Sequence, residues 1–498
     1  MALTSLWQDL HPRDAPTRTE VGGTYDVVVV GAGLSGLTTA LLLARAGKSV
    51  LVLEAGRVGH GTTGRSTAKV SVLQGTRFSE IARKHPLATL RRYVSANEAA
   101  QSWVRDFCQE HGVDAQERSA VTYANGASGQ RAVRRELELG LEAGLPVTWL
   151  GRAALPFETA GAVSLPGQLQ VDPVALLDAL ADQVRAHGGE IIEEARVRGV
   201  SGSGPTTVST ALGDCRGHHV VVATNMPILD RGGFFARMKA QRSYGLAFRT
   251  PTSLVDEMCI AADAPSRSLR DARDETSALL LVGGNGHPTG RESSPLARLE
   301  ELRVWTRQNF PEAGDETHAW SAQDYVPAHS LPYAGPVLPG ADHLLVCGGY
   351  AKWGMTNGVA AAMVLSARML GGECDWADVF STERPAELRG LPMLALANGE
   401  VGLEMTTGWL RPLLTRASTP TEGEGRVAFD HLGGPGAEST VDGVVRRVSG
   451  VCTHLGGVVR WNDAETSWDC PLHGSRFAED GEVLEGPATC GLRAVTQG

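Results

Sequence analysis

Four side chains near the carboxyl end of this 498-residue chain have the types and spacing of metal ligands. Cys452-x-His454 is followed by fifteen residues and then by Cys470-x-x-His473, so each loop offers one thiolate and one imidazole. Zinc modules more often pair two cysteines in one knuckle and two histidines in the other. The mixed pairing favours a [2Fe–2S] cluster with two cysteines on one iron and two histidines on the other. A Cys₂His₂ zinc site is the alternative.

A second group of residues, between Tyr25 and Ala55, has the spacing of a dinucleotide site. Gly31, Gly33 and Gly36 form G-x-G-x-x-G, and Glu54 follows eighteen residues after the last glycine. The three glycines permit a sharp turn, a close approach to a pyrophosphate, and tight helix–sheet packing. Glu54 has the chemistry to bind a ribose diol and to repel a 2′-phosphate. The pattern predicts dinucleotide binding and leaves FAD and NAD both open.

The elements around the glycines are those that such a site needs. Tyr25–Val30 ends in four valines and reads as a buried strand, and 49–53 reads as a second strand. Apolar residues between Leu34 and Ala44 repeat at helical spacing, which places the helix N-terminus at the phosphates. The short apolar run at Val220–Ala223 is expected to rejoin the same parallel sheet. The fold class predicted here is α/β, of the Rossmann type.

Composition limits the function further. The net charge is −10 with no long basic run, which argues against nucleic-acid binding. No stretch reaches the roughly 18 apolar residues of a membrane span, and the first residues lack the apolar core of a secretory signal. The first five of the eight cysteines are scattered singly, which indicates a reducing compartment. We therefore expect a cytoplasmic protein without a membrane span.

Changes in composition suggest the domain boundaries. Residues 1–23 are expected to form a surface arm, and 24–415 a nucleotide-binding domain with an interleaved antiparallel substrate-binding domain, mainly 241–335. Residues 416–425, rich in Ser, Thr, Pro and Gly, read as a linker, and 426–498 as a small all-β domain. The predicted helices are 79–111 divided at Pro86, 130–143, 173–186, 295–309, 359–370, and 393–414 with breaks.

The carboxyl-terminal residues resemble the Rieske family beyond the four ligands. The flanking matches are Gly456, Gly474, Ser475, Phe477, Asp480-Gly481 and Gly486-Pro487-Ala488. Many Rieske proteins carry an extra cysteine in each ligand loop, and those two form a disulfide. Gly457 and Leu472 stand at these positions here, so that disulfide is absent.

The first part of the chain resembles the D-amino-acid oxidase-like family of FAD-dependent oxidoreductases, which includes glycine, sarcosine and glutamylputrescine oxidases. The resemblance runs over roughly 6–370 and rests on the fingerprint, on Thr63–Lys69 and on Gly348–Gly358. With the Rieske-like tail, the whole chain looks like a bacterial subgroup in which such a flavoprotein carries a fused Rieske domain. Ala223–Asn225 and Trp320–Tyr325 look like that subgroup too. The resemblance favours FAD over NAD.

The resemblance implies roles in cofactor binding. Glu54 would hold the adenosine ribose, Val197 would face the adenine, and 65–69 would pass near the isoalloxazine. Gly348–Thr356 would wrap the flavin ring and ribityl chain, and the following helix would direct its dipole there. The implied FAD-binding residues are Gly31, Gly33, Leu34, Ser35, Gly36, Glu54, Ala55, Arg65, Ser66, Thr67, Ala68, Val197, Ala223, Thr224, Gly348, Gly349, Trp353, Gly354, Met355 and Thr356.

Catalytic residues are harder to assign from the sequence. Lys352 and Lys69 lie in the cofactor segments, where a lysine near flavin N5 would organise water or stabilise the reduced ring, although each fits a solvated charge too. Tyr244 is the third candidate. Asp324, Tyr325 and His329 are further candidates, and Arg242 and Arg65 have the guanidinium groups to hold a substrate carboxylate or to form surface ion pairs.

The function expected from these parts is oxidation of a small amine or amino acid by hydride transfer to FAD. Electrons would then pass one at a time to the [2Fe–2S] cluster and to an external acceptor, which is a protein, a quinone or O₂. One alternative is an NAD(P)H-dependent reductase that serves a partner oxygenase. The glycine-rich stretch Leu279–Gly290 lacks the fingerprint spacing that this alternative needs. A non-enzymatic redox sensor is another.

The cluster is predicted to have a midpoint potential in the lower part of the Rieske range, which spans roughly −150 to +300 mV. The loops lack the disulfide pair, and Phe477 replaces the tyrosine found in many high-potential centres, so there are fewer hydrogen bonds to the sulfurs to raise the potential. Ser475 still offers one hydroxyl donor. A redox titration followed by EPR measures the value. A potential near the high, respiratory-complex end would contradict the prediction.

Overall fold

The computed structural model describes residues 3–13, 19–274, 276–383, 391–415, 419–429 and 434–495, and for 391–397 and 414 only the backbone. Its first sheet contains the glycine fingerprint and has the strand order β16-β17-β10-β1-β2-β7. Strands β17, β10, β1, β2 and β7 run parallel, so the expected return of the chain to this sheet after the fingerprint is confirmed. Their bounds are β1 Thr24–Val30, β2 Val50–Leu53, β7 Glu190–Ile192, β8 Val197–Ser201, β9 Thr206–Thr210, β10 Gly213–Val222, β16 Tyr333–Pro336 and β17 Leu344–Gly348.

Helices cover this sheet because each has an apolar side to bury. Helix α2 (Leu34–Arg45) lies against α9 (Gly354–Leu370) and α6 (Pro173–Ala186). Asp172 caps α6 by accepting hydrogen bonds from the backbone N–H groups of its first turn, as its position before a proline predicts. The predicted division at Pro86 is confirmed, since α3 (Arg77–Ala82) and α4 (Leu87–His111) flank it.

The second sheet forms the other half of the large domain and has the order β15-β11-β14-β13-β12-β4-β6-β3, with β5 beside β6. It is wider than the expected region 241–335, because β3, β4, β5 and β6 come from residues 69–171. These strands join through the parallel pairing of β12 with β4, a contact across more than a hundred residues that alternation within a strand does not reveal. The bounds are β3 Lys69–Val70, β4 Ala115–Tyr123, β5 Thr148–Leu150, β6 Ala162–Val171, β11 Met238–Thr250, β12 Met258–Ala261, β13 Arg267–Arg273, β14 Ala278–Pro288 and β15 Glu316–Pro327.

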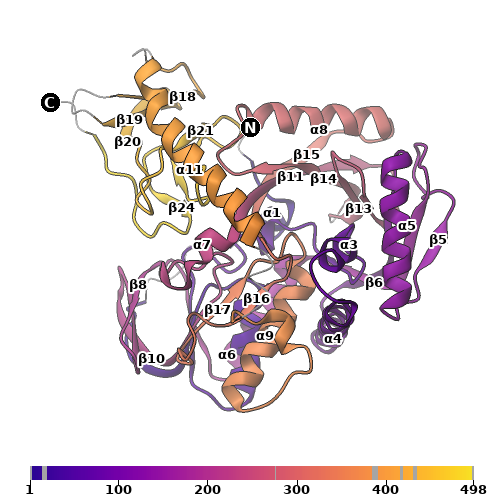
Figure 1. Cartoon of the computed structure of the whole chain (residues 1–498), viewed down its shortest axis with the longest axis horizontal. Coiled ribbons are helices and arrows are strands. Elements are labelled where there is room, and N and C mark those ends of the chain that lie inside the picture. Colours follow the sequence, from indigo (N-terminus) through magenta and orange to yellow (C-terminus); the bar gives the residue numbers. More distant parts are fainter. Residues whose placement is uncertain are drawn as a thin grey trace.

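Helices also flank the second sheet. Helix α8 (Pro295–Asn309) packs on β14, and Ser294 caps it by accepting from Ala297 N at 3.2 Å. Helix α5 (Ala127–Glu142) packs on β6 at the outer end of the sheet (Figure 1). The glycine-rich stretch lies mainly in β14, which pairs antiparallel with β11 on one side and β13 on the other. It is therefore part of an interior strand and not the turn of a second nucleotide fold.

A small β domain follows at the carboxyl end, as predicted. It has a three-stranded sheet, β18 Gly425–Phe429, β19 Pro435–Val441 and β20 Val444–Ser449, and a four-stranded sheet, β21 Arg460–Asn462, β22 Ser467–Asp469, β23 Arg476–Ala478 and β24 Val483–Glu485. The ligand loops connect β20 to β21 and β22 to β23. Trp468 is fully buried, and its ring centroid lies 4.7 Å from that of Trp461 on the neighbouring strand. This pair is therefore part of the core of the small domain.

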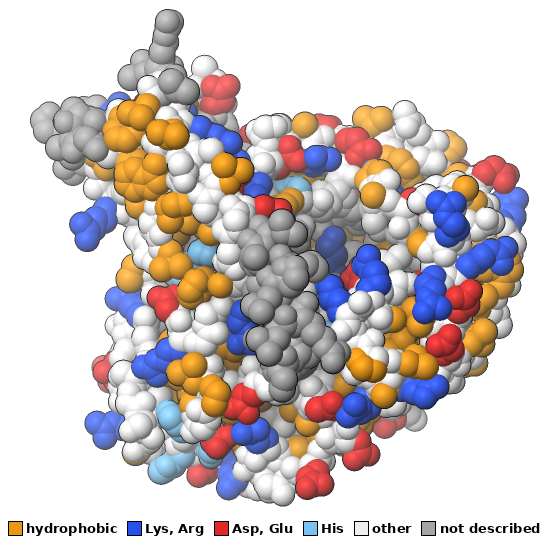
Figure 2. All heavy atoms as spheres, in the orientation of Figure 1, with side chains coloured by type: hydrophobic (Ala, Val, Ile, Leu, Met, Phe, Trp, Pro, Cys, Tyr) orange, Lys and Arg blue, Asp and Glu red, His pale blue; other side chains and the backbone are white. Residues whose placement is uncertain are grey.

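Helix α11 (Leu391–Leu414) lies between the two domains (Figure 1). The expected breaks are wrong, because the helix is continuous and includes Pro412. Val401 and Met405 pack against the core of the small domain, and Glu404 forms an ion pair with Arg460. Leu403, Leu410 and Leu413 are exposed, and Trp409 is partly exposed while its Nε1 donates to Gly456 O of the small domain at 3.2 Å. Figure 2 shows hydrophobic side chains on this part of the surface. In the expected linker, residues 416–418 lie outside the described residues, and Glu422 already bridges to Thr440.

The expected amino-terminal arm is wrong in its first half, because residues there are buried. Helix α1 (Leu6–Leu10) places Leu6 and Trp7 in the core, and Trp7 Nε1 donates to Ser66 O at 2.7 Å. Ser5 Oγ donates to Gly64 O at 2.6 Å. The short helix therefore fixes the loop between β2 and β3. Residues 1–2 and 14–18 of the expected arm lie outside the described part of the chain.

Replacing Gly36 tests the packing at the fingerprint. A Cβ there would lie 1.9 Å from the carbonyl oxygen of Gly31, so Gly36→Ala forces the helix away from the strand. We expect a loss of about 1–3 kcal/mol in unfolding free energy together with weaker FAD retention. Gly151→Ala is the control, since nothing lies within 4 Å of a Cβ at Gly151. Thermal melting and the flavin-to-protein ratio measure both effects, and equal behaviour of the two variants would contradict the account.

Candidate functional site

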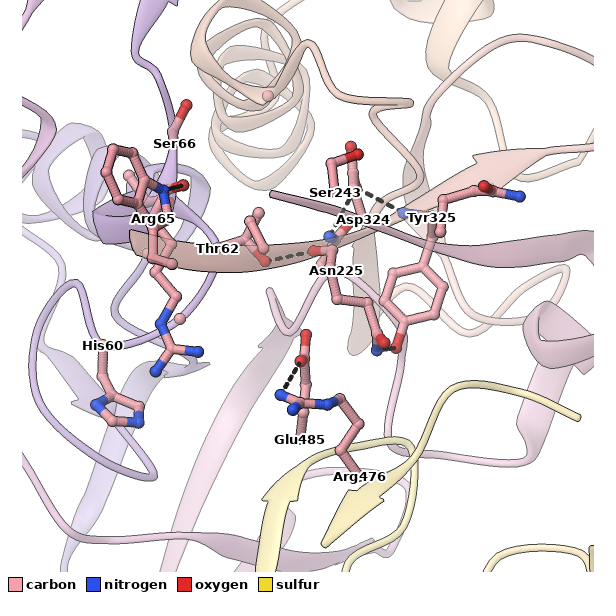
Figure 3. A pocket seen from close by; sticks show the side chains of 18 of the residues that line it. His60, Thr62, Arg65, Ser66, Asn225, Ser243, Asp324, Tyr325, Arg476 and Glu485 are labelled. Atoms are coloured by element: carbon pink, nitrogen blue, oxygen red, sulfur yellow. Dashed lines mark hydrogen bonds and ion pairs between the residues drawn. The ribbon is translucent and has the colours of Figure 1, made fainter. Parts of the chain in front are cut away.

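A cavity of about 1030 Å³ lies at the carboxyl end of β1 and extends to the second sheet and the small domain. Such a volume is at the upper end for ligand sites. Figure 3 shows Arg476 and Glu485 of the small domain facing the same space as Thr62, Asn225 and Asp324. Of the residues expected to bind FAD, those in its wall are Gly31, Gly33, Leu34, Ser35, Glu54, Ala55, Arg65, Ser66, Thr67, Val197, Ala223, Thr224, Trp353, Gly354 and Met355.

Five of the expected cofactor residues, Gly36, Ala68, Gly348, Gly349 and Thr356, lie outside the wall. They shape the segments behind it. A Cβ at Gly348 would lie 1.9 Å from the carbonyl oxygen of Asn225, so that strand end requires glycine. The hydroxyl of Thr356 accepts from Gln74 Nε2 at 3.1 Å, which ties the start of α9 to a buried polar network.

Glu54 stabilises the glycine turn. Its Oε2 accepts from Ala32 N at 2.7 Å and its Oε1 accepts from Gly56 N at 2.9 Å. Burial raises the pKa of Glu54, while these hydrogen bonds and the charge of Arg196 oppose the rise. The carboxylate therefore holds both sides of the cleft in which a ribose would lie.

The turn fits a dinucleotide phosphate. Gly31 has a φ of 105°, and a Cβ there would lie 2.8 Å from the carbonyl oxygen of Ala223. The residue before α2 is Gly33, so the N-terminal N–H groups of this helix have no side-chain cap from that position. A side chain at either glycine would narrow the space between turn and helix. Leu34 N donates to Thr63 Oγ1 at 3.3 Å, and the other N–H groups of the first turn, with the helix dipole, suit a pyrophosphate.

Asp324 connects three segments of the wall. Its carboxylate accepts from Asn225 Nδ2 at 2.8 Å, from Tyr325 N at 2.7 Å and from the backbone N–H of Lys352. Asn225 Oδ1 in turn accepts from Gly349 N at 3.2 Å. Asn225 and Lys352 both have positive φ values, 62° and 74°, which these bonds stabilise. Burial raises the pKa of Asp324, and the hydrogen bonds that it accepts oppose the rise. These bonds fix the backbone geometry beside the ring segment.

The structure brings both candidate lysines to the cavity wall. Lys69 Nζ donates to the carbonyl oxygen of Cys259 at 2.7 Å, and burial lowers its pKa to about 7. The side chain of Lys352 is exposed, and it lines the cavity. Burial lowers the pKa of Lys352, and the negative charge of Asp324 opposes this fall. A Cβ at Gly286 would lie 2.8 Å from Lys352 Nζ, so a glycine leaves the space that this ammonium occupies.

Tyr244, the third catalytic candidate, also lines the cavity. Its hydroxyl lies 3.0 Å from His287 Nε2. Burial raises the pKa of Tyr244 and lowers that of His287, so a neutral phenol faces a neutral imidazole. His329 and Arg242 are not in the wall. Wall residues that the sequence analysis missed include His60, Arg196, Ser243, Arg476 and Glu485, whose positions depend on the meeting of distant segments.

Arg242 holds a carboxylate of the small domain. Its guanidinium has no exposed surface, and its Nη2 lies 2.6 Å from Glu465 Oε1 while its Nε contacts the other oxygen. Arg476 lies 3.1 Å from Glu465 as well. Burial raises the pKa of Glu465, but the two guanidinium charges outweigh it and hold that pKa well below its usual value. Arg65 lines the cavity, whereas Arg242 is committed to the domain interface.

The cluster cysteines lie together in the small domain. Cys452 and Cys470 are both buried and hydrogen-bond to one another. The hydrogen bond from Cys470, followed by backbone N–H groups of 454 and 455 and the hydroxyl of Ser475, lowers the pKa of Cys452 to about 7. The hydrogen bond to Cys452, followed by burial, raises the pKa of Cys470 well above its usual value, and the backbone N–H groups of 472 and 473 oppose this rise. Cys452 is therefore the thiolate of the pair and Cys470 the thiol, which would lose its proton on binding a metal.

The histidines form a second, separate pair. The rings of His454 and His473 are 5.1 Å apart at 85°. His473 Nδ1 is buried without a hydrogen-bond partner, and burial followed by the nearby His454 lowers the pKa of His473 to about 4, so the ring is neutral. Among the described residues, no three ligating side chains converge as the ligands of one ion do. Two cysteines together and two histidines together fit a [2Fe–2S] cluster, and an orphaned ring nitrogen is what its iron would bind.

Comparison with known proteins agrees with both sites. Residues 26–368 match the model of the FAD dependent oxidoreductase family, called DAO, and residues 426–496 match that of the Rieske [2Fe-2S] domain. The chain belongs to the FAD dependent oxidoreductase family. It is an oxidoreductase that binds FAD in the large domain and a [2Fe–2S] cluster in the Rieske domain. Among the residues described, no helix is long and apolar enough to cross a membrane.

Similar proteins include a putative Rieske 2Fe-2S iron-sulfur protein, YhfW, of Bacillus subtilis, which is 31% identical over 94% of this chain and 93% of its own length. The gamma-glutamylputrescine oxidoreductase of Escherichia coli is 28% identical over 42% of this chain and half of its own. The crystal structure of glycine oxidase from Geobacillus kaustophilus has a TM-score of 0.61 at 20% identity and covers 74% of this chain and 99% of its own. This solved structure supports the fold of the flavin domain.

Lys69 is expected to make stability depend on pH. Its pKa is about 7 in the folded protein and close to 10.5 unfolded, so between these values only the unfolded chain holds the proton. Wild-type stability should therefore rise with pH in that window by up to about 1.4 kcal/mol per unit, relative to Lys69→Met. Below pH 7 the difference should be constant. Thermal melts from pH 6 to 9 measure it, with the exposed Lys48→Met as control. A pH-independent difference would contradict a buried, neutralised Lys69.

Proposed function

We propose that this flavoprotein oxidises a small amine or amino acid at FAD and that the electrons pass one at a time to the Rieske cluster and then to an external acceptor. The observation that carries the proposal is the shared cavity. Segments expected to bind the dinucleotide and residues of the Rieske domain such as Glu485 line one continuous space. The names of the similar proteins, among them gamma-glutamylputrescine oxidoreductase and glycine oxidase, support the substrate class.

The cavity is suited to a neutral amine. FAD, when bound, supplies hydride acceptance and one-electron release. Burial lowers the pKa values of Lys69 and Lys352, and any positive charge that these lysines keep disfavours the protonated form of a bound amine. Arg65 adds a guanidinium to the wall for a substrate carboxylate, with its pKa lowered by burial but still that of a cation. Tyr244 presents a phenol on the second sheet.

One segment supports the transfer between the two centres. Ala223, Thr224 and Met226 line the cavity directly after β10. A few residues later, Asp230 and Phe235 contact the histidines of the cluster. A short stretch of covalent chain therefore leads from the flavin site to the histidine pair, which is the side by which we expect electrons to enter.

Anaerobic mixing with a panel of secondary amines and amino acids is predicted to bleach the flavin absorbance, followed by the EPR signal of a reduced cluster. NADH and NADPH at equal concentration are expected to leave both unchanged, because β14 provides no second nucleotide fold. Stopped-flow absorbance with freeze-quench EPR measures the two events. If NADH bleaches the flavin and no amine does, a reductase is favoured. If neither NADH nor any amine bleaches it, a redox sensor is favoured. Either result would contradict the proposal.

A substitution at Lys352 tests the cavity wall. Lys352→Met removes the ammonium that projects into the cavity and keeps the length of the stem, so flavin reduction by substrate should slow by at least tenfold, about 1.4 kcal/mol in barrier. Dithionite should still reduce both centres fully. The matched control is Lys239→Met, which removes a partly exposed ion pair with Glu400. An unchanged rate of flavin reduction in Lys352→Met would contradict this placement.

A further inference from the structure

The cluster histidines face the flavin domain. The side chain of His454 is only 6% exposed. The ring of Phe235 lies 5.6 Å from that of His454 and 5.1 Å from that of His473, edge-on to both. Asp230 Oδ1 lies 2.8 Å from His454 Nε2. The side of the cluster site with the histidines is therefore an interface within the chain.

A tight turn presents Asp230 and Phe235 on the same side. It consists of η2 (Arg231–Gly233) and the short helix α7 (Phe234–Arg237), and Gly232 and Gly233 have φ values of 75° and 60°. A Cβ at Gly232 would lie 2.4 Å from a backbone carbonyl oxygen, so that position requires glycine. Arg237 donates to a second carbonyl of the flavin domain at 2.9 Å. The turn is firmly part of the flavin domain, and the cluster domain is the partner that docks on it.

The hydrogen bond has a defined chemical effect on a histidine ligand. An imidazole that binds metal through one nitrogen donates its other N–H to a partner, which fixes the ring orientation and makes the ligand more basic. With Asp230 at Nε2 of His454, the nitrogen left for iron is Nδ1, and Nδ1 is also the unpartnered nitrogen of buried His473. The two rings thus offer the same atom. A carboxylate beside one of them adds negative charge, which favours the oxidised cluster.

We propose that Asp230 is a positioning residue for the Rieske cluster, which orients His454 and lowers the midpoint potential of the cluster. The proposal rests on the bound cluster, and on the proposed function only for the direction of electron flow. Because Asp230 belongs to the flavin domain, the cluster has its low potential when the domains are docked. A Rieske domain that moved away from this turn would lose the carboxylate and become easier to reduce. Docking and redox poise are therefore coupled.

The test is a mediated redox titration of full-length holoprotein, followed by the EPR signal of the reduced cluster and without any amine. In Asp230→Ala the ratio of reduced to oxidised cluster at fixed ambient potential should rise at least threefold, about 28 mV at 59 mV per tenfold for one electron. Asp230→Asn keeps an acceptor but no charge, so its shift should be smaller and in the same direction. The control is Asp342→Asn, because Asp342 is 63% exposed against 64% for Asp230 and pairs with Arg368 within the flavin domain.

Three results would overturn the proposal. One is a wild-type potential in Asp230→Ala at normal iron content. Another is an equal shift in Asp342→Asn, which would indicate a general surface-charge effect. The third applies if Asp230→Ala fails to assemble the cluster: the overturning result is then an unchanged midpoint potential in Asp230→Asn. Since the titration uses dithionite and mediators, it stands even if no amine reduces the flavin, and the proposed function is then judged separately.

Discussion

The ion pair between Arg242 and Glu465 holds the two domains together at a point from which water is excluded. Arg242 has no exposed surface, Glu465 is 9% exposed, and Arg476 contacts the same carboxylate. A buried charge without its partner costs roughly 3–5 kcal/mol. The network therefore penalises any shift of the Rieske domain that separates these ions while they remain buried. Its contribution is to select one docked geometry, and the shared cavity exists only in that geometry.

Other contacts extend the same interface along the cofactor cleft. Gln323 Nε2 donates to Gly474 O at 2.8 Å, beside a cluster loop, and Tyr325 Oη donates to Gly486 O at 3.1 Å. Arg196, which directly precedes β8 and lines the cavity, donates to Val483 O at 2.9 Å. Residues of the cofactor segments thus also bind the Rieske domain. The chain combines its flavin site and its cluster site through side chains that serve both.

The sequence predictions that are confirmed rest on patterns among neighbouring residues. The features that the sequence did not reveal depend on contacts between residues far apart in the chain. The fingerprint strand and helix and the cap at Asp172 follow from spacing over a few residues. The partner of Arg242 lies more than two hundred residues away, so the sequence alone left substrate and ion-pair roles equally open. Burial of Trp7 depends on a loop that the amino-terminal residues meet only after folding. The extent of the second sheet depends on a pairing between separate segments.

We propose that one chain carries electrons from a reduced flavin to its own cluster. Rapid freeze-quench EPR after anaerobic mixing with a substrate that bleaches the flavin tests this most directly, at several protein concentrations. The account predicts that the reduced-cluster signal appears after the flavin is bleached, at a rate independent of protein concentration, because transfer occurs within the docked chain. A cluster that stays oxidised beside a fully bleached flavin, or that is reduced at a rate proportional to protein concentration, would contradict it.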